Sequence, residues 1–218
     1  MVTTESPLLP LAAGALRAFI SRSFSQHAPM KMTTEGDLIA VAPLLPAKPS
    51  LRMVLRAATT ADHEAVDSEF GRFDLTLRLS YTQFLMAHAR VLGVLEGAVA
   101  GIWSPWRARF PLLKADLAEL GVTVSEGKPL PTRSTAAQWG ALYVLEGSRL
   151  GGGILAGRVG PELPKRYLSA THEAGSWRKF ADALEQAGGS ESDSWRADAI
   201  GGAKLAFARF TQSATETR

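Results

Sequence analysis

Apolar residues recur every three or four positions through most of the chain beyond residue 50, a spacing typical of amphipathic helices. The pattern shows no sustained alternation of apolar and polar residues, which would indicate strands, and no internal repeat. We therefore predict an all-α fold, a bundle of roughly six to eight helices. The clearest helical periodicity lies in Leu51–Phe70, Tyr81–Val99, Leu112–Leu120, Thr135–Arg158, Ser176–Ala187 and Trp195–Gln212.

The Leu51–Phe70 segment carries the first chemically informative pattern. His63 projects from its apolar stripe, and Asp67 follows one turn later on the same side, where it could accept a proton from one ring nitrogen. The other nitrogen would then be free to bind a metal. Arg56, two turns before His63, could hold an anionic group of the same ligand. The alternative is that His63 is a hydrogen-bonded core residue, which is the more common role for a lone histidine on an apolar face.

The other histidines carry no such pattern. Leu92, rather than a carboxylate, follows one turn after His88, so we interpret His88 as a core residue or as the donor of an inter-helix hydrogen bond. His27 lies in the N-terminal segment and His172 in a predicted loop.

The Thr135–Arg158 helix is unusual in its glycines at positions 147, 151, 152 and 153. Each interior glycine destabilises a helix by about 1 kcal/mol relative to alanine. Glycines permit a kink, and they allow either a flat ligand or a second helix to approach the backbone closely. The glycines alone do not discriminate between the ligand and the helix.

Composition limits the function classes. A chain of 218 residues with 46% hydrophobic and 21% charged residues is ordinary for one large globular domain. The absence of cysteine excludes disulfides and thiolate metal sites. A net charge of +3 without a dense Lys/Arg run argues against nucleic-acid binding. No apolar run reaches the roughly 18–20 residues that span a membrane, and we expect a cytoplasmic protein.

Residues 1–50 differ from the rest of the chain. Prolines recur at positions 7, 10, 29, 43, 46 and 49, acidic residues are few, and no helical period persists. We predict a mostly disordered N-terminal extension, with a targeting peptide as the alternative. The folded domain is predicted to span residues 51–213.

Four segments in order, Leu55–Leu75, Tyr81–Glu96, Arg109–Gly121 and Ala136–Val159, resemble the bacterial heme oxygenases, in particular those associated with bacteriophytochromes. The similarity extends from about Leu51 to Phe210 and leaves out residues 1–50. No single motif is diagnostic. The order is the specific feature, with a histidine early in the first helix and a glycine-rich helix well downstream.

The resemblance implies that heme lies between a proximal helix, whose histidine binds the iron, and a kinked, glycine-rich distal helix. His63 matches the proximal ligand, and the residues at 147, 151 and 152 match the distal glycines. Arg56 matches a residue that contacts a heme propionate, and Tyr143 falls near a distal tyrosine position. Weaker candidates for propionate contacts are Arg178, Lys179 and Lys204.

The implied activity is oxidative cleavage of heme to biliverdin, carbon monoxide and ferrous iron, in which heme is both substrate and cofactor. The reaction uses O2 and electrons from a ferredoxin or another reductase, and a bacteriophytochrome could receive the biliverdin.

The sequence departs from the family at one position. Many heme oxygenases carry an aspartate directly after the first distal glycine, and it organises the water that protonates bound oxygen. Here Ser148 takes that place and joins Gly147, Gly151 and Gly152 as a predicted catalytic residue. The flanking Glu146 and Arg149 are expected to be solvent-facing charges, with the anchoring of waters as the alternative.

Two alternative functions remain. One is a heme carrier or sensor without turnover, which Ser148 favours. The other is a helical protein that binds a different small molecule, with His63 as a core residue.

Overall fold

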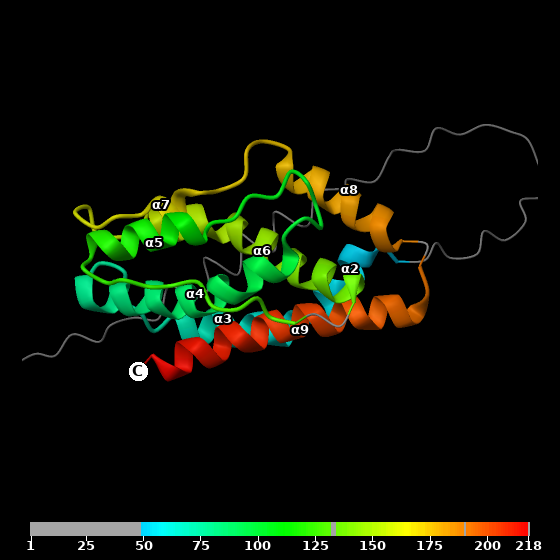
Figure 1. The fold of residues 1–218 in the computed structure, drawn as a ribbon, viewed down its shortest axis with the longest axis horizontal. Coiled ribbons are helices and arrows are strands. Elements are labelled where there is room, and N and C mark those ends of the chain that lie inside the picture. Colours follow the sequence, from blue (N-terminus) through cyan, green and yellow to red (C-terminus); the bar gives the residue numbers. More distant parts are fainter. Residues whose placement is uncertain (1–48, 132–133, 190, 218) are drawn as a thin grey trace, which may run out of the picture.

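The computed structural model describes residues 49–131, 134–189 and 191–217, and within these ranges every regular element is a helix (Figure 1). This confirms the predicted all-α class. The predicted disordered extension falls almost wholly on residues 1–48, which lie outside the described residues. The helices are α2 (Leu51–Ala58), α3 (Thr60–Phe70), α4 (Arg78–Val99), α5 (Phe110–Glu119), α6 (Thr135–Ala156), α7 (Arg166–Ser169), α8 (Ser176–Gly188) and α9 (Asp193–Glu216).

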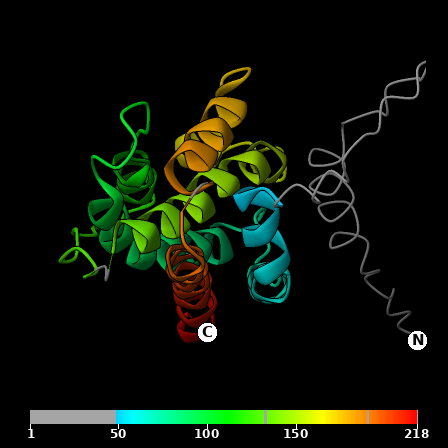
Figure 2. The same ribbon diagram turned by 90° about the vertical axis from the view of Figure 1, so that its right-hand side faces the viewer.

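Helices α6 and α9 make the most extensive contact in the bundle. In Figure 2, α6 crosses above α9, while α2 and α3 lie beside α9. The α3 helix also packs mainly on α9. The glycine-rich helix and the helix that carries His63 therefore share α9 as a common support. The α6 helix is continuous from Thr135 to Ala156, and a kink within it stays a prediction.

The single helix predicted over Leu51–Phe70 is two helices, because the backbone breaks at Thr59, where φ is −118° and ψ is 11°. The hydroxyl of Thr59 donates to the Leu55 carbonyl at 2.8 Å, and that of Thr60 donates to the Arg56 carbonyl at 2.9 Å. Hydroxyls that bond to carbonyls one turn back bend a helix. The break separates the segment that carries Arg56 from the one that carries His63.

Two buried carboxylates fix the start of helices near α6. Glu96 on α4 accepts hydrogen bonds from the backbone N–H groups of Arg109 at 2.7 Å and Phe110 at 2.9 Å, at the start of α5. Asp116 on α5 accepts from the backbone N–H groups of Arg166 at 3.2 Å and Tyr167 at 2.9 Å, at the start of α7. Both carboxylates satisfy helix N–H groups that would otherwise lack partners.

Candidate functional site

His63 lies on a helix that buries none of its side chains. Its own side chain is 39% exposed, which excludes the core-histidine interpretation. The Nδ1 atom lies 3.1 Å from the Asp67 carboxylate, as the spacing predicted, and the ring packs edge-on against Phe207 at a centroid distance of 5.6 Å. Because Asp67 holds Nδ1, Nε2 is the nitrogen available to a ligand.

The glycines of α6 lie in different surroundings, so the absence of a side chain has a different consequence at each position. A Cβ atom on Gly147 would meet no described atom within 4 Å. A Cβ atom on Gly152 would lie 2.8 Å from the Leu168 carbonyl oxygen, and one on Gly153 would lie 3.3 Å from the Thr171 methyl group. Gly152 and Gly153 therefore let the segment around α7 pack against α6, whereas Gly147 borders open space.

Ser148, beside Gly147, is an exposed residue whose hydroxyl is held from within the protein. It donates to the Leu145 carbonyl at 2.7 Å. The guanidinium of Arg109 donates to the same hydroxyl and, at 3.1 Å, to the same carbonyl. Arg109 is only 3% exposed, and its guanidinium lies over the ring of Tyr167, 5.1 Å from the centroid. Neither Arg109 nor Tyr167 was predicted as a site residue.

The expectation that Glu146 and Arg149 face solvent is wrong. Glu146 is 2% exposed and accepts a hydrogen bond from Arg149 Nε at 2.8 Å. Its other carboxylate oxygen lies 2.8 Å from His172 Nε2. Arg149 also donates to the backbone carbonyls of Arg107 and Ala170. The network ties both neighbouring loops to α6.

Burial by itself would raise the pKa of Glu146. The hydrogen bond from His172 and the charge of Arg149 outweigh that effect, so the pKa is lowered and the carboxylate stays ionised. The His172 side chain is 9% exposed, and its Nδ1 has no hydrogen-bond partner among the described residues. The sequence pattern predicts only a loop position for His172.

Tyr143 lies one turn before Gly147 and is 7% exposed. Burial raises the pKa of its hydroxyl, and the nearby charges of Arg52 and Arg56 oppose that increase. The structure thus brings the cations of α2 close to Tyr143 on α6. Of the weaker candidates, Lys204 pairs with Asp62 at 3.1 Å, and Arg178 and Lys179 are exposed on α8.

His88 packs in an aromatic cluster, as predicted for a core residue. Its hydrogen bond is within α4, from Nδ1 to the Phe84 carbonyl at 3.0 Å, and is not the inter-helix bond offered as the alternative. Burial lowers its pKa to about 4, so the imidazole is neutral at physiological pH. The surrounding rings belong to Phe70, Phe84, Tyr167 and Phe210.

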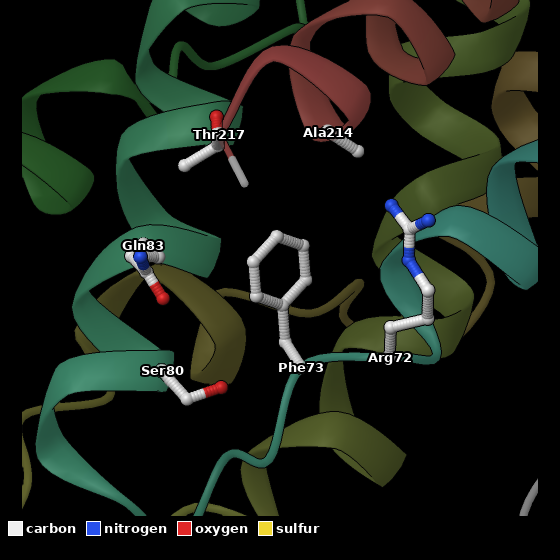
Figure 3. Close-up of a pocket in the computed structure, with 6 residues that line it drawn as sticks. All are labelled: Arg72, Phe73, Ser80, Gln83, Ala214 and Thr217. Carbon is white, nitrogen blue, oxygen red and sulfur yellow. The ribbon is translucent and has the colours of Figure 1, made fainter.

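A separate hollow of about 420 Å³ lies between the start of α4 and the end of α9 (Figure 3). It is lined by Arg72, Phe73, Ser80, Gln83, Ala214 and Thr217, and none of the predicted site residues is among them.

The part of the chain that the structure describes contains no helix with the length and apolar character of a membrane span. The same residues include no group of three or more side chains that could bind a metal ion.

This all-helical chain resembles known proteins in both sequence and fold. No protein-family model matches the chain. A heme oxygenase of Xanthomonas campestris pv. campestris (strain 8004) is 38% identical over 153 residues, which cover 64% of this chain and 92% of that protein. The chain belongs to the heme oxygenase family.

The fold of the chain also resembles that of a heme oxygenase. The crystal structure of the NO- and CO-bound heme oxygenase from Neisseria meningitidis superposes with a TM-score of 0.64 at 28% sequence identity. The match covers 77% of this chain and 92% of the Neisseria chain.

Proposed function

We propose that this protein is a heme oxygenase that cleaves heme to biliverdin, carbon monoxide and ferrous iron. The observation that carries the proposal is a pair of surfaces on α3 and α6, two helices that both pack on α9. One presents the half-exposed His63 with its Nδ1 held by Asp67, and the other is the open backbone at Gly147. The Xanthomonas and Neisseria relatives support the same assignment.

The residues present fit heme. A single imidazole would suffice as protein ligand, because the porphyrin brings its own nitrogen ligands to the iron. Nε2 of His63 would bind the iron, and the Asp67 carboxylate would fix the tautomer and the orientation of the ring. Gly147 and Gly151 would border the opposite porphyrin face. Gly152 would act indirectly, by seating α6 against α7.

The remaining predicted residues would orient the substrate. Arg56 is proposed to bind a heme propionate, since its charge lies near the Tyr143 hydroxyl on the facing helix. Tyr143 would close the space beside Gly147. When bound, heme supplies the iron at which O2 is reduced, and the protein supplies position, polarity and a place for water at Ser148.

We place the reaction in the cytoplasm, with a ferredoxin or another reductase as electron donor. A bacteriophytochrome is the proposed recipient of the biliverdin. Both partners rest on the family resemblance.

The second candidate is a heme carrier or sensor without turnover. Ser148 favours it, because a hydroxyl carries no charge with which to organise the proton-delivering water. Heme binding does not separate the two functions, since His63 and Gly147 would serve both. Turnover does.

The first test is hemin binding by absorption spectroscopy, with wild-type protein, His63→Ala and His88→Gln. We expect a Soret band in the wild type and in His88→Gln, a control that removes the buried histidine. His63→Ala should lose the ligated spectrum, and added imidazole should restore it. An unchanged spectrum in His63→Ala would contradict the proposed ligand.

The second test adds ascorbate or a ferredoxin system in air. Decay of the Soret band with growth of a broad far-red biliverdin band is expected. A stable Soret band without a red product would instead establish the carrier or sensor.

A further inference from the structure

The buried guanidinium of Arg109 donates two hydrogen bonds to the middle of α6. Arg109 enters from the loop before α5, and both of its contacts with α6 come from Nη2, which donates to the Leu145 carbonyl and to the Ser148 hydroxyl. Glu96 fixes its backbone N–H at 2.7 Å, so the residue is anchored at both ends. The position of the Arg109 guanidinium is therefore set by α4, α5 and α6 together.

The hydrogen bonds of the Ser148 hydroxyl can be counted. Its proton goes to the Leu145 carbonyl, and one lone pair accepts from Arg109. A hydroxyl has two lone pairs, so one acceptor position is left. Ser148 is exposed, so this position is accessible to a water molecule.

The charge of Arg109 has no direct carboxylate partner among the described residues. Its nearest contacts are a carbonyl, a hydroxyl and the face of the Tyr167 ring, all of them neutral. Glu96 is bonded to the backbone N–H groups of Arg109 and Phe110, and Glu146 is bonded to Arg149 and His172. Burial lowers the pKa of Arg109, and the charges of Glu96 and Glu146 oppose that effect without a direct ion pair. A buried guanidinium without a directly bonded carboxylate is costly to keep.

We propose that Arg109 and Ser148 form one unit on the oxygen side of heme, in which Ser148 holds a water and Arg109 places a buried positive charge that favours anionic oxygen there. Arg109 is a positioning residue that acts through Ser148. By the family resemblance, Ser148 stands where many heme oxygenases carry the distal aspartate. The unit would act there through a positive charge instead of a negative one. The inference rests on the proposed function. It explains how an enzyme without that aspartate would provide a charge on the side of heme where oxygen binds.

The test is the acid–alkaline transition of the ferric heme complex, in which the water on the iron loses a proton, followed by absorption against pH. A nearby positive charge lowers that midpoint. Arg109→Met should raise the midpoint by about 0.5 pH unit or more, and Arg109→Lys, which keeps the charge, should lie closer to the wild type. Arg109→Gln, which can still donate to the Leu145 carbonyl, should show the same upward shift if the Met variant does not fold.

Arg196→Met is the matched control. Arg196 is 7% exposed and donates to the carbonyls of Pro49 and Gly189, on a part of α9 that does not contact Ser148. Its midpoint should equal that of the wild type. An unchanged midpoint in a neutral Arg109 variant that binds one equivalent of hemin would overturn the inference and leave the proposed function standing. Absence of a His63-dependent heme complex in the wild type would overturn both.

Discussion

The carbonyl oxygen of Ala199 on α9 lies 1.8 Å from the point where a Cβ atom on Gly140 of α6 would stand. The contact is reciprocal, because a Cβ atom on Gly202 of α9 would lie 2.0 Å from the carbonyl oxygen of Ala137. The two helices thus cross with their backbones in contact. The crossing fixes α6, and with it Gly147, relative to the helix on which α3 packs.

A methyl group at Gly202 should force this crossing apart. We expect Gly202→Ala to lower the free energy of unfolding by about 2 kcal/mol or more, the magnitude usual for overpacking. Gly201→Ala is the control, since its Cβ would meet no described atom within 4 Å, and it should stabilise the protein by about 0.5–1 kcal/mol through helix propensity. Urea unfolding of the heme-free protein measures both. Equal effects at the two positions would contradict the backbone contact.

Replacement of Gly147 by alanine should stabilise the heme-free protein and weaken the binding of hemin. Because a Cβ there meets open space, Gly147→Ala should raise the free energy of unfolding of the heme-free protein by about 0.5–1 kcal/mol. The same methyl group would project toward the porphyrin, so the dissociation constant for hemin should increase. Gly152→Ala, whose Cβ would meet the Leu168 carbonyl at 2.8 Å, should instead destabilise the heme-free protein. Hemin affinity in Gly147→Ala equal to wild type would remove Gly147 from the porphyrin surface.

The buried ion pair between Glu146 and Arg149 on α6 should contribute far more to the free energy of unfolding than an exposed ion pair does. Glu146→Gln leaves Arg149 buried without its carboxylate, and we expect a loss of about 3 kcal/mol in the free energy of unfolding. Glu119→Gln is the control, because Glu119 pairs with Arg166 at 2.7 Å with both side chains about half-exposed, at 51% and 52%. Its effect should stay below about 0.5 kcal/mol. Similar thermal melts for the two variants would show that the buried network contributes little.

His88 should make stability depend on pH. Its folded-state pKa of about 4 lies below the ordinary value of 6.5, so between these values the unfolded chain binds the proton and the folded chain does not. Stability from this residue is complete above pH 6.5 and is lost as the pH falls toward 4, by at most about 3 kcal/mol.

His88→Gln removes the titrating group. Its free energy of unfolding should fall less steeply over the same pH range, as measured by urea unfolding at a series of pH values. A parallel decline in the two proteins would assign the acid sensitivity to other groups.

The sequence alone was sufficient for features that depend on neighbours within a few residues. Six predicted helical segments cover seven of the eight described helices, and the i,i+4 spacing predicted the contact between His63 and Asp67. The break at Thr59 was missed, although two adjacent threonines that bond to carbonyls one turn back are also a local feature. The resemblance to heme oxygenases rested on the order of such local patterns, and the relatives confirm it.

Contacts between distant residues were decided only by the tertiary structure. Glu146 and His172 are 26 residues apart, and Arg109 and Ser148 are 39 apart, and no periodicity indicates that either pair meets. The sequence placed charges at 146 and 149 in a helix, but whether they face solvent depends on which elements cover that side of it. The roles of the glycines divide for the same reason. Gly147 and Gly152 are chemically identical, and only the packing of α7 against one of them makes the first an open surface and the second a close contact.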